Sequence, residues 1–411
     1  MARLPDLVRD SQLDTEFRNG YTVHKIFESN AFSRRRAIPR EEYWMVGRHV
    51  GGGGCGSIWL ERCVHGTPNG TVRAVKKIAL GRQGLKDVTY IRELEAAAKF
   101  SQPKYVNWFV QCFGWYECSG SLCIAMEYCE LGDLQGYLSS NPPLPERESQ
   151  EIMFQILEGI RYMHEHAFAH RDLKPANILV KAIPPEPWWV KITDFGISKR
   201  IEESLGVPST MRGTPHFIAP EIYSSIANST GNAPVFLNPY AADMWALGEI
   251  AFQMLTKQPS FKDPFQLFLH AQNPQINPFP VSLLMQHNVS ASGQAFISSL
   301  MPVSPERRLT VVQALDHEWV EQCKLSCPSP TSATSNSTNA GLNVPVISTT
   351  DSLNEQFATW NSSLGSTSET QTSIPPFFAD EQNRTLKTDI QFAFRNQQTG
   401  RQRIARPIRV K

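Results

Sequence analysis

One run of eight residues carries the groups that a particular kind of chemistry needs. Residues 170–177 read His-Arg-Asp-Leu-Lys-Pro-Ala-Asn, so a carboxylate (Asp172), an ammonium (Lys174) and an amide (Asn177) lie in one short segment. Transfer of a phosphoryl group to a hydroxyl needs a group that accepts or orients the hydroxyl proton, a positive charge beside the phosphate and an oxygen ligand for a metal ion. The segment therefore predicts a phosphoryl-transfer site that contains these three residues.

A glycine-rich segment earlier in the chain is a candidate for holding phosphates. Residues 51–58 read Gly-Gly-Gly-Gly-Cys-Gly-Ser-Ile, and glycines let backbone N–H groups approach a triphosphate without a clash from Cβ. The same residues are compatible with a flexible turn or with a dinucleotide-binding fingerprint. The segment lies between two predicted strands, 43–49 and 57–63, whereas that fingerprint opens a helix. This position favours a phosphate loop of a different kind.

A strand that ends in an acidic turn adds a candidate metal ligand. Residues 190–196 read Val-Lys-Ile-Thr-Asp-Phe-Gly, which places Asp194 after an apolar strand and 22 residues beyond Asp172. Mg²⁺ prefers oxygen ligands and is usually held by one or two side chains together with phosphate oxygens. The intervening residues 183–189 predict a lengthened hairpin loop, since insertions in surface loops cost little entropy.

Together these segments resemble the motifs of eukaryotic protein kinases, in the same order and at similar distances, over residues 43–322. The run 73–76 (Arg-Ala-Val-Lys) and the run 219–221 (Ala-Pro-Glu) complete the set. The resemblance is to the Ser/Thr type, because tyrosine kinases usually lack a lysine at the position of Lys174. Residues 125–134 and 305–319 look most like calcium/calmodulin-dependent and checkpoint-type kinases.

The resemblance implies a site for ATP and Mg²⁺. In it Asp172 accepts or orients the proton of the substrate hydroxyl, Lys174 neutralises charge on the γ-phosphoryl group, and Asn177 and Asp194 ligate the metal ions. Lys76 holds the phosphates and pairs with Glu93 of a following helix, for which Glu95 is an alternative. The complete set of implied cofactor-binding residues is Val50, Gly51, Gly52, Gly53, Gly54, Cys55, Gly56, Ser57, Ile58, Ala74, Lys76, Glu93, Glu127, Cys129, Leu179 and Asp194.

The resemblance also implies how the site is regulated. Thr210 lies where related kinases are phosphorylated, with Ser209 as a competitor, and a phosphate there could pair with Arg171. Arg308 resembles the arginine that pairs with Glu221. The alternative to an active enzyme is a pseudokinase scaffold, which would normally have lost Lys76, Asp172, Asn177 or Asp194, and all four are present.

The expected fold is an α+β, two-lobed protein kinase fold. The small β-rich N-lobe, about 43–128, should contain strands 43–49, 57–63, 72–78 and 122–127 and one main helix, 88–100. The larger and mostly helical C-lobe, about 129–322, should contain helices 148–164 and 242–255. Residues 1–42 are expected to be an N-terminal extension and residues 323–411 a Ser/Thr-rich, C-terminally basic tail, with both tails disordered.

Composition limits the classes of partner and compartment. The formal net charge of +1 gives no support to a nucleic-acid partner, and no apolar run approaches the length of about 20 residues that would span a bilayer. The eight cysteines are scattered and several fall in predicted strands, which favours reduced thiols in the cytoplasm and/or nucleus. Protein substrates bearing Ser or Thr are the expected partners besides ATP.

Overall fold

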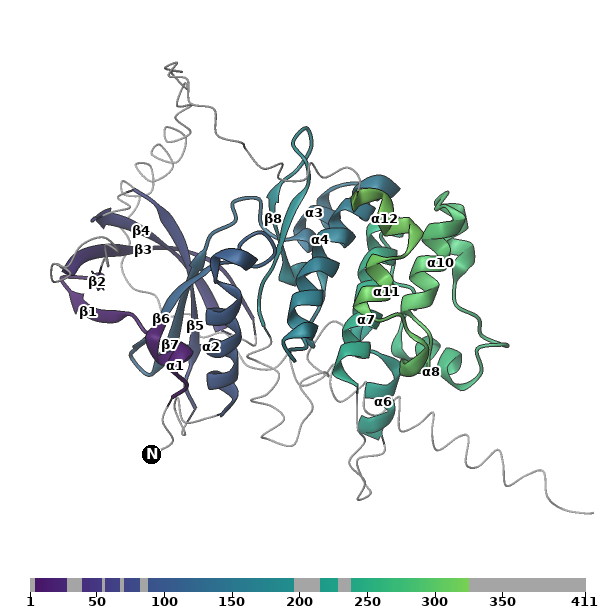
Figure 1. Ribbon diagram of the computed structural model, residues 1–411, viewed down its shortest axis with the longest axis horizontal. Coiled ribbons are helices and arrows are strands. Elements are labelled where there is room, and N and C mark those ends of the chain that lie inside the picture. Colours follow the sequence, from purple (N-terminus) through teal and green to yellow (C-terminus); the bar gives the residue numbers. More distant parts are fainter. Residues whose placement is uncertain are drawn as a thin grey trace, which may run out of the picture. The chain divides into compact units, whose positions relative to one another are not determined.

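The computed structural model describes residues 4–27, 39–53, 56–66, 70–81, 88–195, 215–227 and 238–324, all within one compact unit. Seven strands form an antiparallel sheet in the order β1-β2-β3-β4-β5-β7-β6, drawn in purple and blue in Figure 1. Their bounds are β1 Asp14–Arg18, β2 Tyr21–Phe27, β3 Pro39–Gly53, β4 Gly56–His65, β5 Val72–Ala79, β6 Cys112–Cys118 and β7 Ser121–Glu127. The four strands predicted for this part of the chain are confirmed as β3, β4, β5 and β7.

One main helix accompanies this sheet, as predicted. Helix α2 (Val88–Phe100) has the bounds expected from its sequence. Its buried residues Tyr90 and Leu94 pack against Ile78 and Leu122 of the sheet, whereas Phe100 packs into the core of the helical part. The helix therefore contacts both halves of the molecule.

The remaining described helices form the larger part, drawn in teal and green in Figure 1. Their bounds are α3 Leu134–Ser140, α4 Glu146–Glu165, α6 Pro220–Ala227, α7 Pro239–Thr256, α8 Pro264–Gln272, α9 Val281–Gln286, α10 Ala291–Leu300, α11 Val311–Leu315 and α12 Glu318–Lys324. Strands β8 (Ile178–Ala182) and β9 (Trp189–Ile192) form an antiparallel hairpin, which confirms the predicted loop between them. The two helices predicted from their apolar patterns are α4 and α7.

Local sequence signals explain where these helices begin. Asn238 accepts hydrogen bonds from the first backbone N–H groups of α7, and Pro239 follows it at the first helical position. Thr310 and Gln313 form a reciprocal capping box at α11. Helix α7 is buried almost all round, so it forms the centre of the helical core.

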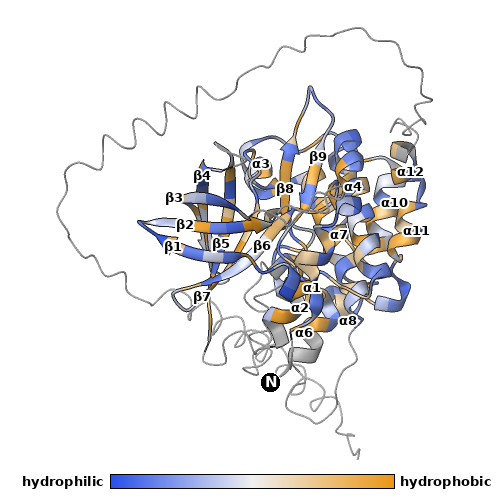
Figure 2. Ribbon diagram, turned by 60° about the vertical axis from the view of Figure 1, so that its left-hand side comes forward, coloured by the Kyte–Doolittle hydropathy of each residue, from blue (hydrophilic) through white to orange (hydrophobic). Residues whose placement is uncertain are grey.

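Apolar side chains from nearly all of these elements build the cores. Figure 2 shows orange apolar and blue polar residues on the same helices and strands, as expected for elements with one buried side. The largest core lies in the helical part and contains Trp245, Phe252, Phe296 and Trp319. None of the helices in the described part combines the length and the apolar character that crossing a membrane requires.

The expectation of a disordered N-terminal extension is wrong for residues 4–27. These residues form helix α1 (Asp6–Asp10) and strands β1 and β2, and β2 pairs with β3 along its whole length. Glu16, Arg18 and Lys25 lie on one face of these strands, and His24, on the opposite face, is buried. The tail from residue 325 onward lies outside the described residues.

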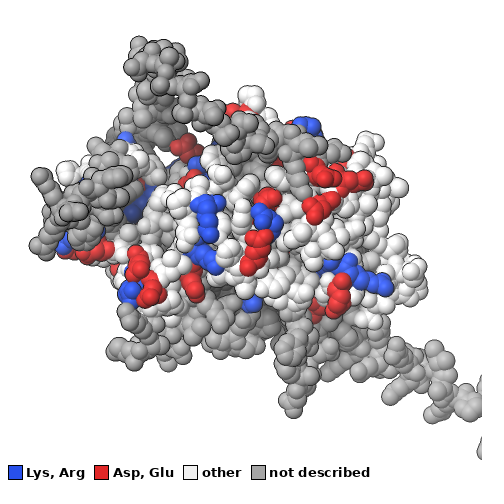
Figure 3. Space-filling model, in the orientation of Figure 1, with Lys and Arg blue, Asp and Glu red and all other residues white. Residues whose placement is uncertain are grey.

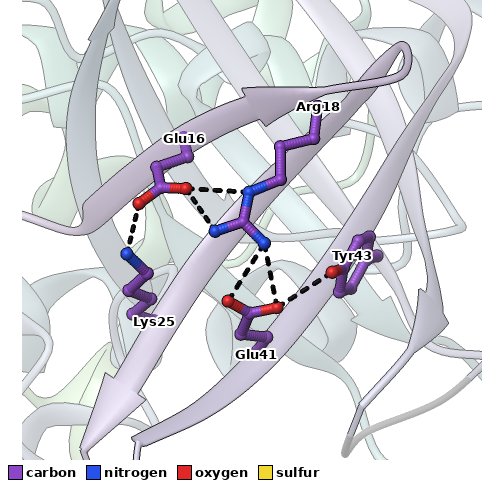
Figure 4. Close-up of polar contacts among 5 residues, drawn as sticks. All are labelled: Glu16, Arg18, Lys25, Glu41 and Tyr43. Carbon is purple, nitrogen blue, oxygen red and sulfur yellow. Dashed lines mark hydrogen bonds and ion pairs between the residues drawn. The ribbon is translucent and has the colours of Figure 1, made fainter.

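Charged side chains on the outer face tie the three strands together (Figure 4). Arg18 of β1 donates to Glu41 of β3 at 3.1 Å and to Glu16, which also pairs with Lys25 of β2. Hydrogen bonds from Lys25 and Arg18 lower the pKa of the Glu16 carboxyl. These cross-strand pairs fix the register of the added strands, although each exposed pair contributes little stability.

Candidate functional site

A pocket between the sheet and the helical part collects most of the predicted nucleotide residues. Nine of the sixteen line it: Val50, Gly51, Ile58, Ala74, Lys76, Glu127, Cys129, Leu179 and Asp194. The predicted metal ligand Asn177 lines it as well. Its further lining includes Ile124, Val110 and Cys112, which the sequence analysis did not assign to the site. Ile124 could have been found, because it lies two residues before the pocket-lining Met126 and alternate residues of a strand share a face.

The glycine-rich segment forms the turn between β3 and β4. Gly52 pairs with Ser57 and Gly53 with Gly56. Gly56 has φ +122°, and a Cβ there would lie 2.3 Å from the Lys77 carbonyl oxygen, so only glycine fits. Gly54 and Cys55 lie outside the described residues.

Residues 170–177, the predicted catalytic segment and named so below, bring their three predicted side chains together. Lys174 Nζ lies 3.0 Å from Asp172 Oδ2. Asn177 Nδ2 donates to the Asp172 backbone oxygen at 2.7 Å and to Asp172 Oδ2 at 3.2 Å. A short 3₁₀ turn, Pro175–Asn177, makes this geometry possible. Because Nδ2 makes both hydrogen bonds, the amide oxygen of Asn177 is the atom left to face a cation.

A buried carboxylate in the helical core holds this segment. Asp243 of α7 is 1% exposed and accepts the backbone N–H of His170 at 2.9 Å and that of Arg171 at 2.7 Å. His164 Nε2 lies 2.9 Å from the same carboxylate. Arg171 adopts a left-handed backbone with φ 65°, which is unfavourable for a non-glycine residue and persists only where surrounding contacts enforce it. Asp243 therefore fixes a strained turn of the catalytic segment.

Asp194 and Lys76 meet inside the pocket. Asp194 also has a left-handed backbone (φ 64°), and its carboxylate forms an ion pair with Lys76, which is 6% exposed. His170 Nε2 donates to the Thr193 carbonyl at 3.0 Å, which joins the catalytic segment to the turn that carries Asp194. The predicted partner of Lys76, Glu93, lies on α2, but its side chain is outside the described residues.

The next residue of this turn points into the core. The ring of Phe195 stacks on Phe100 of α2, with centroids 5.7 Å apart and planes at 25°, and lies 5.7 Å from Phe109. The position of Asp194 is thereby coupled to that of α2.

Glu127 has a structural role that the sequence did not reveal. Its carboxylate binds Lys191 at 2.7 Å and Lys181 at 2.9 Å, which links the end of β7 to the β8–β9 hairpin. Burial alone would raise the pKa of Glu127, but the hydrogen bonds from these two lysines outweigh it and the pKa is lowered. Glu127, one of the implied cofactor-binding residues, also lines the pocket.

Residues 196–214, which include Thr210 and Ser209, lie outside the described part. An ion pair between Arg308 and Glu221 holds the segment that follows them. Arg308, 5% exposed, binds Glu221 through two parallel hydrogen bonds of 2.8 and 2.6 Å, which confirms the predicted pair. Its remaining donors bind the carbonyl oxygens of Ala241, Pro302 and Val303. Because all five N–H groups of Arg308 are hydrogen-bonded, these contacts offset the free-energy cost of removing its charge from water.

Comparison with known proteins identifies the family. The protein kinase domain family matches residues 44–320. The chain belongs to this family. The expectation of a two-lobed kinase fold is confirmed, since a solved structure of Rad53 residues 1–466 in complex with AMP-PNP superposes with a TM-score of 0.53. That likeness covers 74% of this chain and 82% of that one at 24% identity, so it shows the fold alone.

The relatives of this kinase domain are of the expected kind. Serine/threonine-protein kinase RAD53 of Saccharomyces cerevisiae is 32% identical over 241 residues, 58% of this chain and 28% of that protein. Serine/threonine-protein kinase cds1 of Schizosaccharomyces pombe is 31% identical over 51% of this chain and 44% of its own length. Calcium/calmodulin-dependent protein kinase type 1 of Macrobrachium nipponense is 33% identical over 51% and 57%. The chain thus matches less than two thirds of each of these relatives.

The donor set of the kinase pocket fits a magnesium ion. Asp194 offers carboxylate oxygens and Asn177 an amide oxygen, and both line the same cavity. Mg²⁺ is held in proteins by one or two oxygen ligands of this type together with phosphate oxygens, whereas zinc would need thiolate or imidazole ligands.

Proposed function

We propose that this protein is a serine/threonine kinase that transfers the γ-phosphoryl group of ATP to Ser or Thr hydroxyls of other proteins. The observation that carries the proposal is that three separate stretches of the chain meet at one pocket: Lys76, Asp194 and Asn177 line it, and Asp172 is hydrogen-bonded to Asn177. The family match and the names of the relatives support the same conclusion.

The proposed nucleotide position follows from the pocket walls. Adenine would lie between the apolar side chains of Ile58 and Ala74 on the sheet side and Leu179 of β8, all of which line the pocket. Lys76 would then reach the phosphates. Asn177 and Asp194 would hold Mg²⁺, which supplies charge neutralisation for the phosphates when bound.

The proposed chemistry uses the groups around Asp172. Its carboxylate accepts or orients the proton of the acceptor hydroxyl. Lys174, 3.0 Å away, places a positive charge where the transferred phosphoryl group gains negative charge. Asn177 donates a hydrogen bond to the Asp172 carboxylate, so this carboxylate is oriented before the substrate binds.

The proposed partners are protein substrates and an activating kinase. A phosphate on Thr210 would add about −1.5 to −2 charges and could pair with Arg171 of the catalytic segment. If the wild type is phosphorylated at Thr210, Thr210→Ala should have lower activity than the wild type. Equal activity would rule out this switch.

Nucleic acid is not a proposed partner, because net charge is +1 and acidic and basic side chains are interspersed on the face shown in Figure 3. The cytoplasm and/or nucleus is the proposed place of action, which agrees with free cysteines in the described part.

The decisive assay follows labelled γ-phosphate from MgATP into a mixture of proteins, using the full chain. Lys76→Arg is the matched control, because it keeps the charge but changes the shape and reach of the group at the phosphates. Transfer by the wild type that falls strongly in Lys76→Arg supports the proposal. Nucleotide binding without transfer would instead assign a pseudokinase scaffold.

A further inference from the structure

The N-terminal segment, defined here as residues 4–27, lies before the part of the chain that the kinase family matches, residues 44–320. It is nevertheless built into the same unit, through helix α1 and strands β1 and β2. Figure 1 shows α1 near the base of α2 and the edge of the sheet. The contacts of the N-terminal segment indicate what it contributes to the structure.

Helix α1 supplies an apolar contact to α2. Val8 is fully buried and belongs to one cluster with Tyr90 and Leu94 of α2 and with Trp115 of β6. The N-terminal segment thus adds to the apolar packing that holds α2 on the sheet. A buried contact of this kind is lost outright when the side chain is made charged.

Backbone hydrogen bonds fix α1 in this position. The Leu13 N–H donates to the Trp115 carbonyl at 2.8 Å, and the Trp115 N–H donates to the Ser11 carbonyl at 3.1 Å. The Trp115 indole N–H donates to the Val8 carbonyl at 2.8 Å. Since β1 follows these residues directly and β6 is the opposite edge of the sheet, the segment bridges the two outer strands.

A buried polar group anchors β2 to the strand that carries Lys76. His24 is 1% exposed, and Arg73 of β5 donates to its Nε2 at 2.7 Å. Burial, and then the charge of Arg73, lower the pKa of His24 to about 3, so the ring is neutral. Its Nδ1–H therefore donates to Thr15 Oγ1 at 2.9 Å. Arg73 in turn binds the buried Glu61.

Helix α2 also reaches the kinase site. Ala97 lines the nucleotide pocket, and Phe100 stacks on Phe195, the residue after Asp194. The helix therefore contacts both the N-terminal segment and the turn that carries Asp194. A shift of α2 would alter both the pocket wall and the support of Phe195.

We propose that the N-terminal segment is a positioning element of the kinase site: by burying Val8 against α2 and bridging the sheet edges, it holds α2 where phosphoryl transfer needs it. This inference rests on the proposed function and deepens it. Val8, Ser11, Leu13 and Trp115 are its positioning residues. None of them touches the nucleotide pocket.

The test compares Val8→Asp with Val8→Ile and with Val312→Asp in the full chain. Val312 is 53% exposed on α11, so its variant is a matched change at an open site. We expect Val8→Asp to lower kcat about tenfold, because small misplacements of reacting groups are costly. Amide hydrogen exchange in α2 should also become about tenfold faster, while exchange in α7 stays unchanged. Val8→Ile and Val312→Asp should match the wild type.

Two results would overturn the proposal. One is wild-type kcat and wild-type exchange of α2 in Val8→Asp. The other is faster exchange in α2 and α7 alike, which would mean general destabilisation rather than positioning. If Val8→Asp does not fold, Val8→Ala is judged by the same two readouts. A wild type that transfers no phosphate defeats the proposed function instead, and exchange in α2 still reports whether the segment holds the helix.

Discussion

The two sides of the nucleotide pocket are held in place by different physical means. On the helical side, the catalytic segment is fixed by a buried charge: Asp243 binds the backbone at His170 and Arg171. On the sheet side, α2 is held mainly by apolar packing, to which the N-terminal segment contributes Val8. Polar anchors are few and directional, whereas apolar packing is distributed over many small contacts.

This difference teaches where the site is robust and where it can be adjusted. A polar anchor fails when one partner is lost, because the other is left buried without a hydrogen bond. A helix held by apolar packing is destabilised in small steps, since each lost contact changes the free energy only slightly. The helical side should therefore behave as a fixed platform and the sheet side as the adjustable half.

The largest effect should come from the platform itself, at Asp172. Asp172→Asn removes the proton acceptor but keeps the size of the side chain, so kcat should fall about 10²–10⁴-fold. Nucleotide affinity, measured by titration calorimetry, should stay close to that of the wild type. Asp316→Asn, on the exposed surface, is the control. An equal loss of nucleotide affinity would contradict the assigned role.

Loss of the Arg308–Glu221 ion pair, a second polar anchor of the helical side, should strongly reduce the stability of the protein. Arg308→Ala removes a buried guanidinium and leaves Glu221, whose side chain is 14% exposed, without its partner, so the free energy of unfolding in urea should fall by about 3–5 kcal/mol. Arg308→Lys keeps the charge and loses the paired hydrogen bonds, so it should lie between. A loss below about 1 kcal/mol in Arg308→Ala would show that the pair does not hold the platform.

Motifs and periodicity predicted most of this site. Local patterns in the sequence found α2, α4 and α7, and residue types at known spacing found Asp172, Lys174 and Asp194. These features depend on neighbours in the sequence. The Arg308–Glu221 pair was also predicted, but only through resemblance to the family.

The features that sequence reasoning missed depend on distant contacts. The charged residues of β1 and β2 resemble a solvated extension until Glu41 and Tyr43 are placed beside them. Glu127 was assigned to the nucleotide site through the family resemblance, and only the fold brings Lys181 and Lys191 to its carboxylate. Neither partner could be chosen from spacing, since several lysines were available.

A milder change at Asp243, the anchor of the catalytic segment, tests the same comparison. Asp243→Asn keeps the shape of the side chain but turns one acceptor into a donor that faces a backbone N–H. We expect a loss of about 1–3 kcal/mol in the free energy of unfolding. A fall in kcat should accompany it, because the strained turn at Arg171 would relax. Wild-type kcat together with reduced stability would separate the anchor from catalysis.

The last prediction is a pH dependence that arises inside the platform. Burial raises the pKa of Glu249 on α7 to about 7, despite hydrogen bonds from Gln253 and Ser260. The folded state then keeps a proton that the unfolded state loses near pH 4.5. Stability from this group is therefore full below that pH and falls as the pH rises towards about 7.

Glu249→Gln tests this dependence, because glutamine is neutral at every pH. Urea unfolding of the wild type from pH 5 to pH 8 should show a decline that the variant lacks. Parallel curves for the two proteins would mean that Glu249 does not titrate in this range.

The central claim is that this pocket delivers phosphate to serine or threonine. The most direct measurement incubates the full chain with γ-labelled MgATP and peptide pools that differ only in carrying Ser, Thr or Tyr as the acceptor. The account predicts label on the Ser and Thr pools that disappears in Asp172→Asn. Label on the Tyr pool alone, or equal labelling by wild type and Asp172→Asn, would contradict it.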